Sequence, residues 1–280
     1  MTREQFSSDS KVRASLPPGA RSWNPALLEL WLEAWNQRGT PPGRTQPGEG
    51  VERRIDGMKY RFASARSEEQ LDLASELVMR RYAWRGYDAE GAISNDDSAG
   101  EVTFLAQCGA RIDGTLTVRV DGQTELLAEQ LYPQEVARLR RNGAKLCEFG
   151  RLAFDEGINT LEILGPLFHL GMAYTRWRHA CTDMLIEVNP RHAGFYQRVG
   201  GMKVLGDVKT CDRVAAPAVL LHLSLERAAS RAEVEGGERT GRKSIFAYCF
   251  GRDETAALTR ELASLGMGGA EGGFNRAYAL

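Results

Sequence analysis

Apolar and polar residues alternate with a period of two in several short segments of the chain, which is the pattern of half-buried strands. KYRFASA (59–65) shows this alternation. VTFLAQCGARIDGTLTVRV (102–120) shows it in two successive arms, which predicts an antiparallel hairpin. The segment 67–87 opens instead with Ser67 and then Glu69–Gln70, a capped start that predicts a helix.

Downstream, the pattern switches between helical and strand periods. It predicts a short helix (133–143), a strand (145–155), a long helix (161–180), a strand (181–189), a helix (190–201) and two last strands (202–207 and 217–225). The strands 145–155 and 181–189 flank a crossover helix, so we expect them to be parallel neighbours. The remaining pairings are expected to be antiparallel.

Three regions follow from this pattern. Residues 1–50 are an N-terminal extension with one amphipathic helix (24–38) and a Pro/Gly linker. Residues 51–226 form the core domain, and 227–280 a C-terminal extension that begins with a charged surface excursion and contains a terminal helix. The 24–38 helix either packs on the core, forms a lid over an apolar ligand, or makes a peripheral membrane contact.

Composition excludes several classes of function. The 280 residues carry a formal net charge of −1, so no global basic field indicates nucleic-acid binding. Five isolated cysteines indicate reduced thiols in a cytoplasmic protein, and the four histidines have no metal-ligand spacing. There is no signal-peptide pattern and no apolar run of roughly 18 residues. Serine hydrolase, nucleotide hydrolase and metalloenzyme motifs are not found in a suitable context.

The element order, with Asn189 closing a strand and Tyr196 seven residues later on the next helix, resembles the GNAT acyltransferase superfamily. This resemblance implies an α/β (α+β) fold with a mixed, mostly antiparallel twisted sheet. The sheet has a splayed parallel strand pair and helices on both faces. It also implies that Tyr196 gives a proton to a departing thiolate. The alternative is that Phe195 and Tyr196 only pack in the core.

Longer stretches narrow the resemblance. The segments CEFGRLAFD (147–155), LFHLGMAY (167–174), EVNPRHAGFY (187–196), APAVLLHLSL (216–225) and SIFAYCF (244–250) are together similar to the N-acyl amino acid synthases of the FeeM group. This similarity covers roughly residues 58–265. The group is related to the acyl-homoserine lactone synthases. The resemblance to the FeeM group implies transfer of a long fatty acyl chain from acyl carrier protein to the amine of an amino acid.

The E-x-x-R pattern in CEFGR places Glu148 and Arg151 in the site by this resemblance. A carboxylate can take the proton of an attacking amine, and a guanidinium can hold a carboxylate in a bidentate way. Residues three apart on a regular strand face opposite sides. We therefore predict a bulge at Phe149–Gly150 that opens a slot for the pantetheine arm. An ion pair at a strand end is the alternative.

Other candidates surround this pair. Gly150, Leu152 and Asn189 are expected to contact pantetheine. Arg119, at a place where the lactone synthases also use an arginine, and His192, one helical turn from Tyr196, are expected to bind substrate. A solvated edge arginine and a structural histidine are the alternatives.

The donor is expected to be acyl-phosphopantetheine on acyl carrier protein, with acyl-CoA less favoured and no cofactor bound. Residues 151–172 contain no R/Q-x-x-G-x-G/A run, whose backbone would bind a CoA pyrophosphate. Because acyl carrier proteins are acidic, basic helix ends could dock one. The candidates are Arg138, Arg140, Arg141, Arg176 and Arg178. Solvated helix faces are the alternative. The competing functions are a lactone synthase that uses S-adenosylmethionine and a catalytically silent lipid- or partner-binding module.

Overall fold

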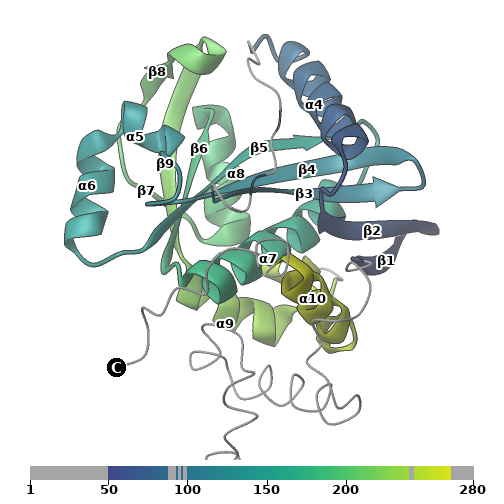
Figure 1. The fold of residues 1–280 in the computed structure, drawn as a ribbon. Helices are drawn as coiled ribbons and strands as arrows, with labels where there is room; N and C mark the ends of the chain where they lie inside the picture. Colours follow the sequence, from purple (N-terminus) through teal and green to yellow (C-terminus); the bar gives the residue numbers. More distant parts are fainter. Residues whose placement is uncertain (1–49, 88–92, 94–95, 97–99, 240–242, 266–280) are drawn as a thin grey trace, which may run out of the picture.

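A single mixed sheet forms the centre of the computed structural model, which describes residues 50–87, 93, 96, 100–239 and 243–265 (Figure 1). The predicted 24–38 helix and its linker lie outside the described residues. The strand order is β1-β2-β3-β4-β5-β6-β9-β7, and β8 pairs with β9. The strands are β1 (Val51–Ile55), β2 (Met58–Ser64), β3 (Glu101–Cys108), β4 (Arg111–Val120), β5 (Leu146–Phe154), β6 (Asp183–Val188), β7 (Lys203–Val204), β8 (Lys209–Cys211) and β9 (Ala216–Ser224).

Helices connect the strands and cover the sheet. The α-helices are α4 (Glu68–Ala83), α5 (Leu127–Leu131), α6 (Pro133–Arg141), α7 (Thr160–His179), α8 (Pro190–Gly200), α9 (Leu225–Glu235) and α10 (Arg252–Leu265). Two 3₁₀ turns, η2 (Asp212–Val214) and η3 (Ile245–Tyr248), complete the set. None of the helices in these described stretches has the length and apolar character needed to cross a membrane.

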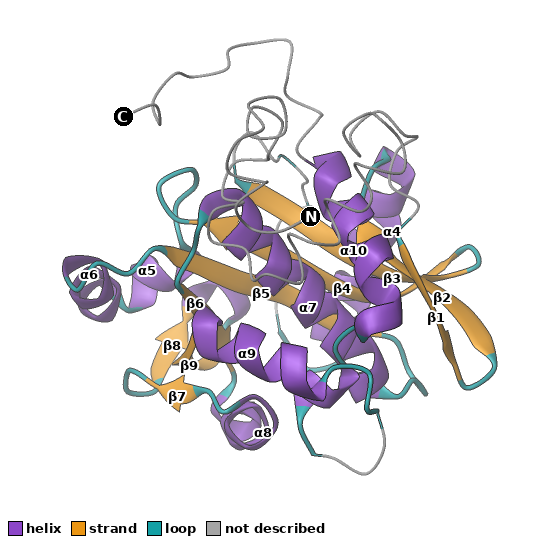
Figure 2. Cartoon of the chain, turned by 90° about the horizontal axis from the view of Figure 1, so that it is seen from below, coloured by secondary structure: helices purple, strands orange, loops and turns teal. Residues whose placement is uncertain are grey.

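The two faces of the sheet bury different material. Below the sheet, α7, α9 and α10 pack side by side (Figures 1 and 2). Val118, Phe149 and Ile186 point into this main core. The opposite face carries two smaller clusters, one under α4 and one under α5 and α6. Alternate residues of each strand face opposite sides, so the residues between the inward apolar positions belong to this second face.

The prediction of one parallel strand pair is confirmed. Leu146 pairs with Asp183 and Phe149 with Ile186 in a parallel ladder, while the other strand pairs are antiparallel. The predicted hairpin at 102–120 is also confirmed, as β3 and β4. The pair β5 and β6 is parallel because the α7 crossover returns the chain to the same end of the sheet before β6 begins.

The sequence pattern did not predict β1, α5, β8, η2 or α9. The sequence of β1, VERRI, reads as polar, yet Arg53 is buried because it pairs with Glu254 and donates to the carbonyl oxygens of Tyr248 and Cys249. Because the inward position 53 is occupied by an arginine, the sequence of β1 does not show the apolar alternation of a strand. The elements α5 and β8 are only 5 and 3 residues long, too short to show a period.

The segment after 226 joins the main core. The predicted surface excursion is instead mostly helical, because Ala228 and Ala232 of α9 pack in the main core. Glu261 of α10 is fully buried and accepts hydrogen bonds from the backbone and hydroxyl of Ser64, each at 2.9 Å, and from Arg66 at 3.1 Å. These contacts fix α10 against β2.

Candidate active site

A bulge interrupts the pairing of β4 with β5. Thr117 pairs with Gly150 and Thr115 with Ala153, so Arg151 and Leu152 both lie opposite Leu116. We predicted the bulge at Phe149–Gly150, and the structure places the extra residue just after Gly150. Arg151 has a φ of +47°, in the left-handed region, and its carbonyl oxygen accepts a 2.8 Å hydrogen bond from Thr115 Oγ1. The left-handed backbone, unusual for arginine, marks where the strand changes direction.

The parallel pair separates at this point. Pairing of β5 with β6 ends at Phe149 and Ile186, although β5 continues to Phe154 and β6 to Val188. Beyond these residues, no described strand pairs with the facing edges of β5 and β6. An extended chain with amide groups, such as pantetheine, has the hydrogen-bonding groups to match such edges.

Glu148 lies just before the separation, on the second face of the sheet. Its residue exposure is 4%, and its Oε2 accepts a hydrogen bond from the backbone N–H of Ala128 at 3.2 Å. Burial, and then the charge of Glu187, raise the pKa of Glu148 to about 7 against the smaller lowering effects of the α5 N–H groups and Arg119. A carboxyl group with this pKa can exchange a proton near neutral pH.

Arg119 lies on the same face as Glu148, directly across the ladder. Its guanidinium forms an ion pair with Glu101 of β3, and only 17% of the side chain is exposed. The next pair along these strands, Thr103 and Thr117, is joined by a 2.9 Å hydrogen bond between hydroxyl groups. A polar row therefore crosses β3, β4 and β5 between the two apolar clusters of this face. Arg119 is part of this row and is not a solvated edge residue.

Sequence reasoning missed Glu187, which lies two residues after Leu185, the parallel neighbour of Glu148. Its Oε2 pairs with Arg213 of η2, and its Oε1 is buried without a hydrogen-bond partner in the described structure. Burial raises the pKa of Glu187, and Arg213 opposes that rise. A carboxylate inside the apolar strand MLIEV was the signal available in the sequence.

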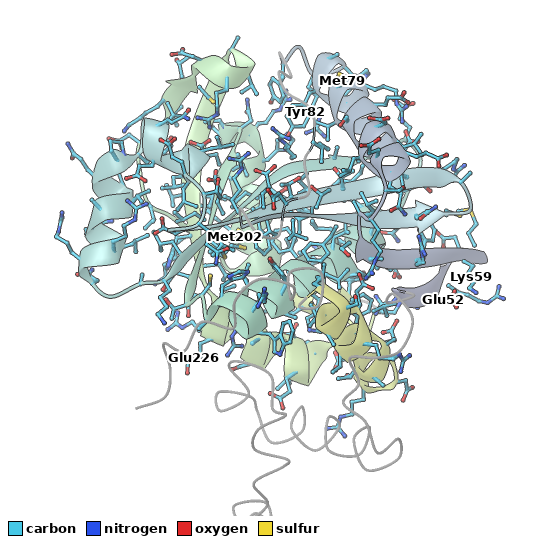
Figure 3. All side chains as sticks on the ribbon, viewed as in Figure 1. Glu52, Lys59, Met79, Tyr82, Met202 and Glu226 are labelled. Atoms are coloured by element: carbon cyan, nitrogen blue, oxygen red, sulfur yellow. The ribbon has the colours of Figure 1, made fainter. Side chains whose placement is uncertain are left out.

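Tyr196 lies in a second group, formed by α8 and the end of α4. It is buried and packs edge-to-face against Phe195, with ring centroids 5.2 Å apart. Burial, and then Tyr82, raise the pKa of Tyr196, while Arg85 lowers it, so the phenol stays protonated at neutral pH. Tyr82 lies on α4 (Figure 3), and the charge of Arg151 lowers the pKa of Tyr82. This links the bulge to Tyr196, but no contact joins Tyr196 to Glu148 in the described structure.

Asn189 and His192 occupy the start of α8. The Oδ1 of Asn189 accepts from the backbone N–H of Arg191 at 3.2 Å, so Asn189 is the N-cap of this helix. His192 Nε2 lies 3.3 Å from Nη1 of Arg85 and 3.2 Å from Nε of Arg191. The expected pantetheine contact of Asn189 and substrate contact of His192 stay predictions. Both residues lie at the end of β6 that has separated from β5.

The predicted docking arginines lie at the other end of this strand pair. Arg138, Arg140 and Arg141 end α6, just before β5 begins, and Arg176 and Arg178 end α7, just before β6 begins. Parallel strands start at the same edge of a sheet, so these arginines are distant from the separated carboxyl ends. The predicted docking surface and the predicted pantetheine slot are therefore at opposite ends of the strands.

Arg140 is also engaged inside the protein. Its guanidinium binds Asp121 at 2.8 and 2.7 Å and Glu129 at 2.6 and 2.7 Å, which raises the pKa of Arg140. A side chain held by two carboxylates has little capacity for a third acidic group. Arg138 and Arg141 are exposed on the surface of α6.

Comparison with known proteins identifies relatives. The sequence profile of the N-acyl amino acid synthase FeeM family matches residues 73–224, just over half of the chain. The solved structure of FeeM, from uncultured soil microbes, is 24% identical with a TM-score of 0.54, and covers 64% of this chain and 95% of FeeM. This likeness shows a shared fold of the GNAT type. No curated protein sequence matches significantly.

Two acyl-homoserine lactone synthases are more distant. LasI is 14% identical with a TM-score of 0.40, covering 59% of this chain and 89% of LasI. The CoA-dependent BjaI is 12% identical with a TM-score of 0.42, covering 69% of this chain and 90% of BjaI. These scores are too low to bear on the reaction.

Proposed function

The chain belongs to the N-acyl amino acid synthase FeeM family and is an acyltransferase, and we propose that it moves a long-chain fatty acyl group from acyl carrier protein to an amino acid. The donor is the thioester of the carrier's phosphopantetheine, and the product is an N-acyl amino acid. The observation that carries this proposal is the buried Glu148, with a pKa of about 7, at the point where β5 and β6 separate.

The reaction requires a neutral amine. An amino acid carries an ammonium group at neutral pH, which must lose a proton before nitrogen can attack the thioester carbon. Glu148 accepts that proton directly or through water, since its pKa lies close to the working pH. The C–N bond then forms and the C–S bond breaks, the nitrogen releases its second proton to water, and the thiolate takes a proton from the Tyr196 hydroxyl or from water. Overall, an ammonium group and a thioester give an amide, a free thiol and one proton, which Glu148 passes to solvent, while Tyr196 regains its proton from water.

Arg151 and Arg119 have different capacities for the amino acid carboxylate. Arg151 lies at the bulge beside the separated strands and is half-buried, and a guanidinium at this place can make a bidentate contact with a small anion. Arg119 already pairs with Glu101, so it supports the site through the charge it presents to Glu148. We therefore assign the carboxylate to Arg151 and a positioning role to Arg119.

The test is a product assay with the purified chain. Acyl carrier proteins loaded with fatty acids of several lengths are incubated with a mixture of amino acids, and the products are identified by mass spectrometry. We expect N-acyl amino acids from the wild type and a loss of about 10²-fold or more in Glu148→Gln, the usual contribution of a general base. Glu156→Gln is the matched control, because Glu156 is an exposed carboxylate outside the site.

Two results would overturn the proposal. If Glu148→Gln and Arg151→Ala both kept turnover within about twofold of wild type, Glu148 could not be the base and Arg151 could not hold the carboxylate. A positioned base contributes far more than about twofold. A product with the mass of an acyl-homoserine lactone, formed only with S-adenosylmethionine, would replace this function with that of a lactone synthase.

A further inference from the structure

Two arginines converge on one histidine beside the separated ends of β5 and β6. Arg85 follows α4, and Arg191 lies in the first turn of α8; both reach Nε2 of His192, at 3.3 and 3.2 Å. A single nitrogen lone pair thus faces two guanidinium groups. Burial, then Arg85 and Arg191, lower the pKa of His192, so the imidazole is neutral and supplies no compensating negative charge.

The other partner of this arrangement is neutral as well. Arg191 donates from Nη2 to the hydroxyl of Tyr87 at 2.9 Å, and its guanidinium lies over the Tyr87 ring, 5.6 Å from the centroid. Neither Arg85 nor Arg191 has a carboxylate partner in the part of the chain that the structure describes.

Neighbouring arginines on α4 behave differently. Arg80 pairs with Asp155 at 3.1 Å, and Arg81 pairs with Glu156 at 2.6 Å. Within the described residues, Arg85 and Arg191 thus differ from these two neighbours in having a histidine, and not a carboxylate, as their shared partner. Two like charges held at one nitrogen repel each other, and an anion bound between them would relieve that repulsion.

Arg85 and Arg191 lie at the distance from Glu148 that is expected for the outer end of the donor's pantetheine arm. The helix α8 starts at Pro190, five residues after Leu185, the parallel neighbour of Glu148. At about 3.3 Å per residue, this is roughly 16 Å along the strand, a length that an extended pantetheine arm can span. The positive end of the α8 dipole points to the same place.

We infer that Arg85 and Arg191, held by His192, bind the phosphate at the outer end of the donor's pantetheine arm. This inference rests on the proposed function, because it takes the thioester to lie near Glu148. Two guanidinium groups can each hold phosphate oxygens with charge-assisted hydrogen bonds. A carrier-bound phosphopantetheine and CoA both present phosphate here, so the arginine pair recognises their shared chemistry. This inference places the basic residues that contact the donor at the separated ends of β5 and β6, and not on α6 and α7 as the sequence predicted.

Equilibrium binding tests this without any turnover. The full chain is titrated with 4′-phosphopantetheine and with pantetheine, which differ only in the phosphate. We expect the wild type to bind the phosphorylated compound at least about tenfold more tightly, since a hydrogen bond to a charged group contributes that much. Arg85→Ala and Arg191→Ala should each lose most of this preference and leave the affinity for pantetheine unchanged.

Arg198→Ala is the matched control, because Arg198 is an exposed arginine of the same helix that does not contact His192. Thermal unfolding confirms that each variant is folded. Equal affinity of the wild type for the two compounds would overturn the inference, and so would an equal loss in Arg198→Ala. Because no acyl transfer is measured, a protein that keeps the phosphate preference but makes no N-acyl amino acid would contradict only the proposed reaction.

Two further titrations separate the sources of the phosphate. Holo-acyl carrier protein and CoA are each bound to the wild type and to the double variant Arg85→Ala/Arg191→Ala. A loss with both ligands supports recognition of the shared phosphate, and the tighter of the two identifies the donor. No loss with either ligand overturns the inference.

Discussion

Glu148 lies directly opposite Arg119 across the β4–β5 ladder, yet the ion pair of Arg119 is with Glu101. In the part of the chain that the structure describes, the buried carboxylate of Glu148 accepts hydrogen bonds from backbone N–H groups, and the charge of Arg119 lowers its pKa only slightly. This explains why burial dominates its pKa. The same relationship makes the protonation of Glu148 sensitive to the charge of Glu187.

Glu148→Gln should make the protein more stable at alkaline pH. Burial raises the pKa of Glu148 from 4.5 to about 7, so ionisation in the folded state is disfavoured. The protonated folded form is fully favoured below pH 4.5, and this stability is lost as pH rises to about 7. The shift corresponds to a loss on the order of 3 kcal/mol.

Urea unfolding at pH 5 and pH 8 measures this difference. The wild type should lose more stability over that interval than Glu148→Gln, because the glutamine keeps an acceptor for the Ala128 N–H and cannot ionise. Equal losses in the two proteins would show that Glu148 has an ordinary pKa.

Glu187→Gln should move the acid limb of the pH–rate profile to lower pH. The negative charge of Glu187 raises the pKa of Glu148, so removing that charge makes Glu148 easier to ionise. The profile of kcat/KM reports the base in the free enzyme. A glutamine is nearly isosteric, so the change tests charge more than shape. An acid limb that stays in place would exclude Glu148 as the titrating base.

Arg151→Gly should separate stability from substrate binding. Arginine at a φ of +47° carries a steric cost of roughly 1–2 kcal/mol that glycine does not. We expect stability to be equal or slightly higher, while the KM for the amino acid rises about tenfold or more through loss of the bidentate contact. Steady-state kinetics and thermal unfolding on the same preparation give both values. Unchanged KM would show that Arg151 shapes only the bulge.

Glu261→Gln should destabilise the fold without touching the site. Glu261 is fully buried and accepts from Ser64 and Arg66, so the change removes a charged acceptor from the interior, while Arg66 itself is exposed. We expect a loss of about 1.5–3 kcal/mol, the contribution of a hydrogen bond to a charged group. Glu52→Gln is the control, because the Glu52–Lys59 pair is exposed (Figure 3) and should contribute about 0–1 kcal/mol. Equal effects of the two changes would show that α10 is not fixed by this contact.

The sequence by itself determined the order of the main elements. Period-two segments and the α7 crossover predicted the hairpin of β3 and β4 and the parallel pair of β5 and β6. It also placed Glu148 and Arg151 on the strand that bulges. These features can be predicted locally. They depend on the period of apolar side chains, on the glycine that favours a bulge, and on the right-handed crossover that joins parallel strands.

Only the tertiary structure decided which charges remain available. Arg140 and Arg85 look alike in the sequence, yet Arg140 is held by two carboxylates and Arg85 by none in the described structure. Glu187 became part of the site because β6 places it near Glu148. Ion pairing depends on residues far apart in the chain, and on the desolvation that burial imposes, so no local pattern could reveal it.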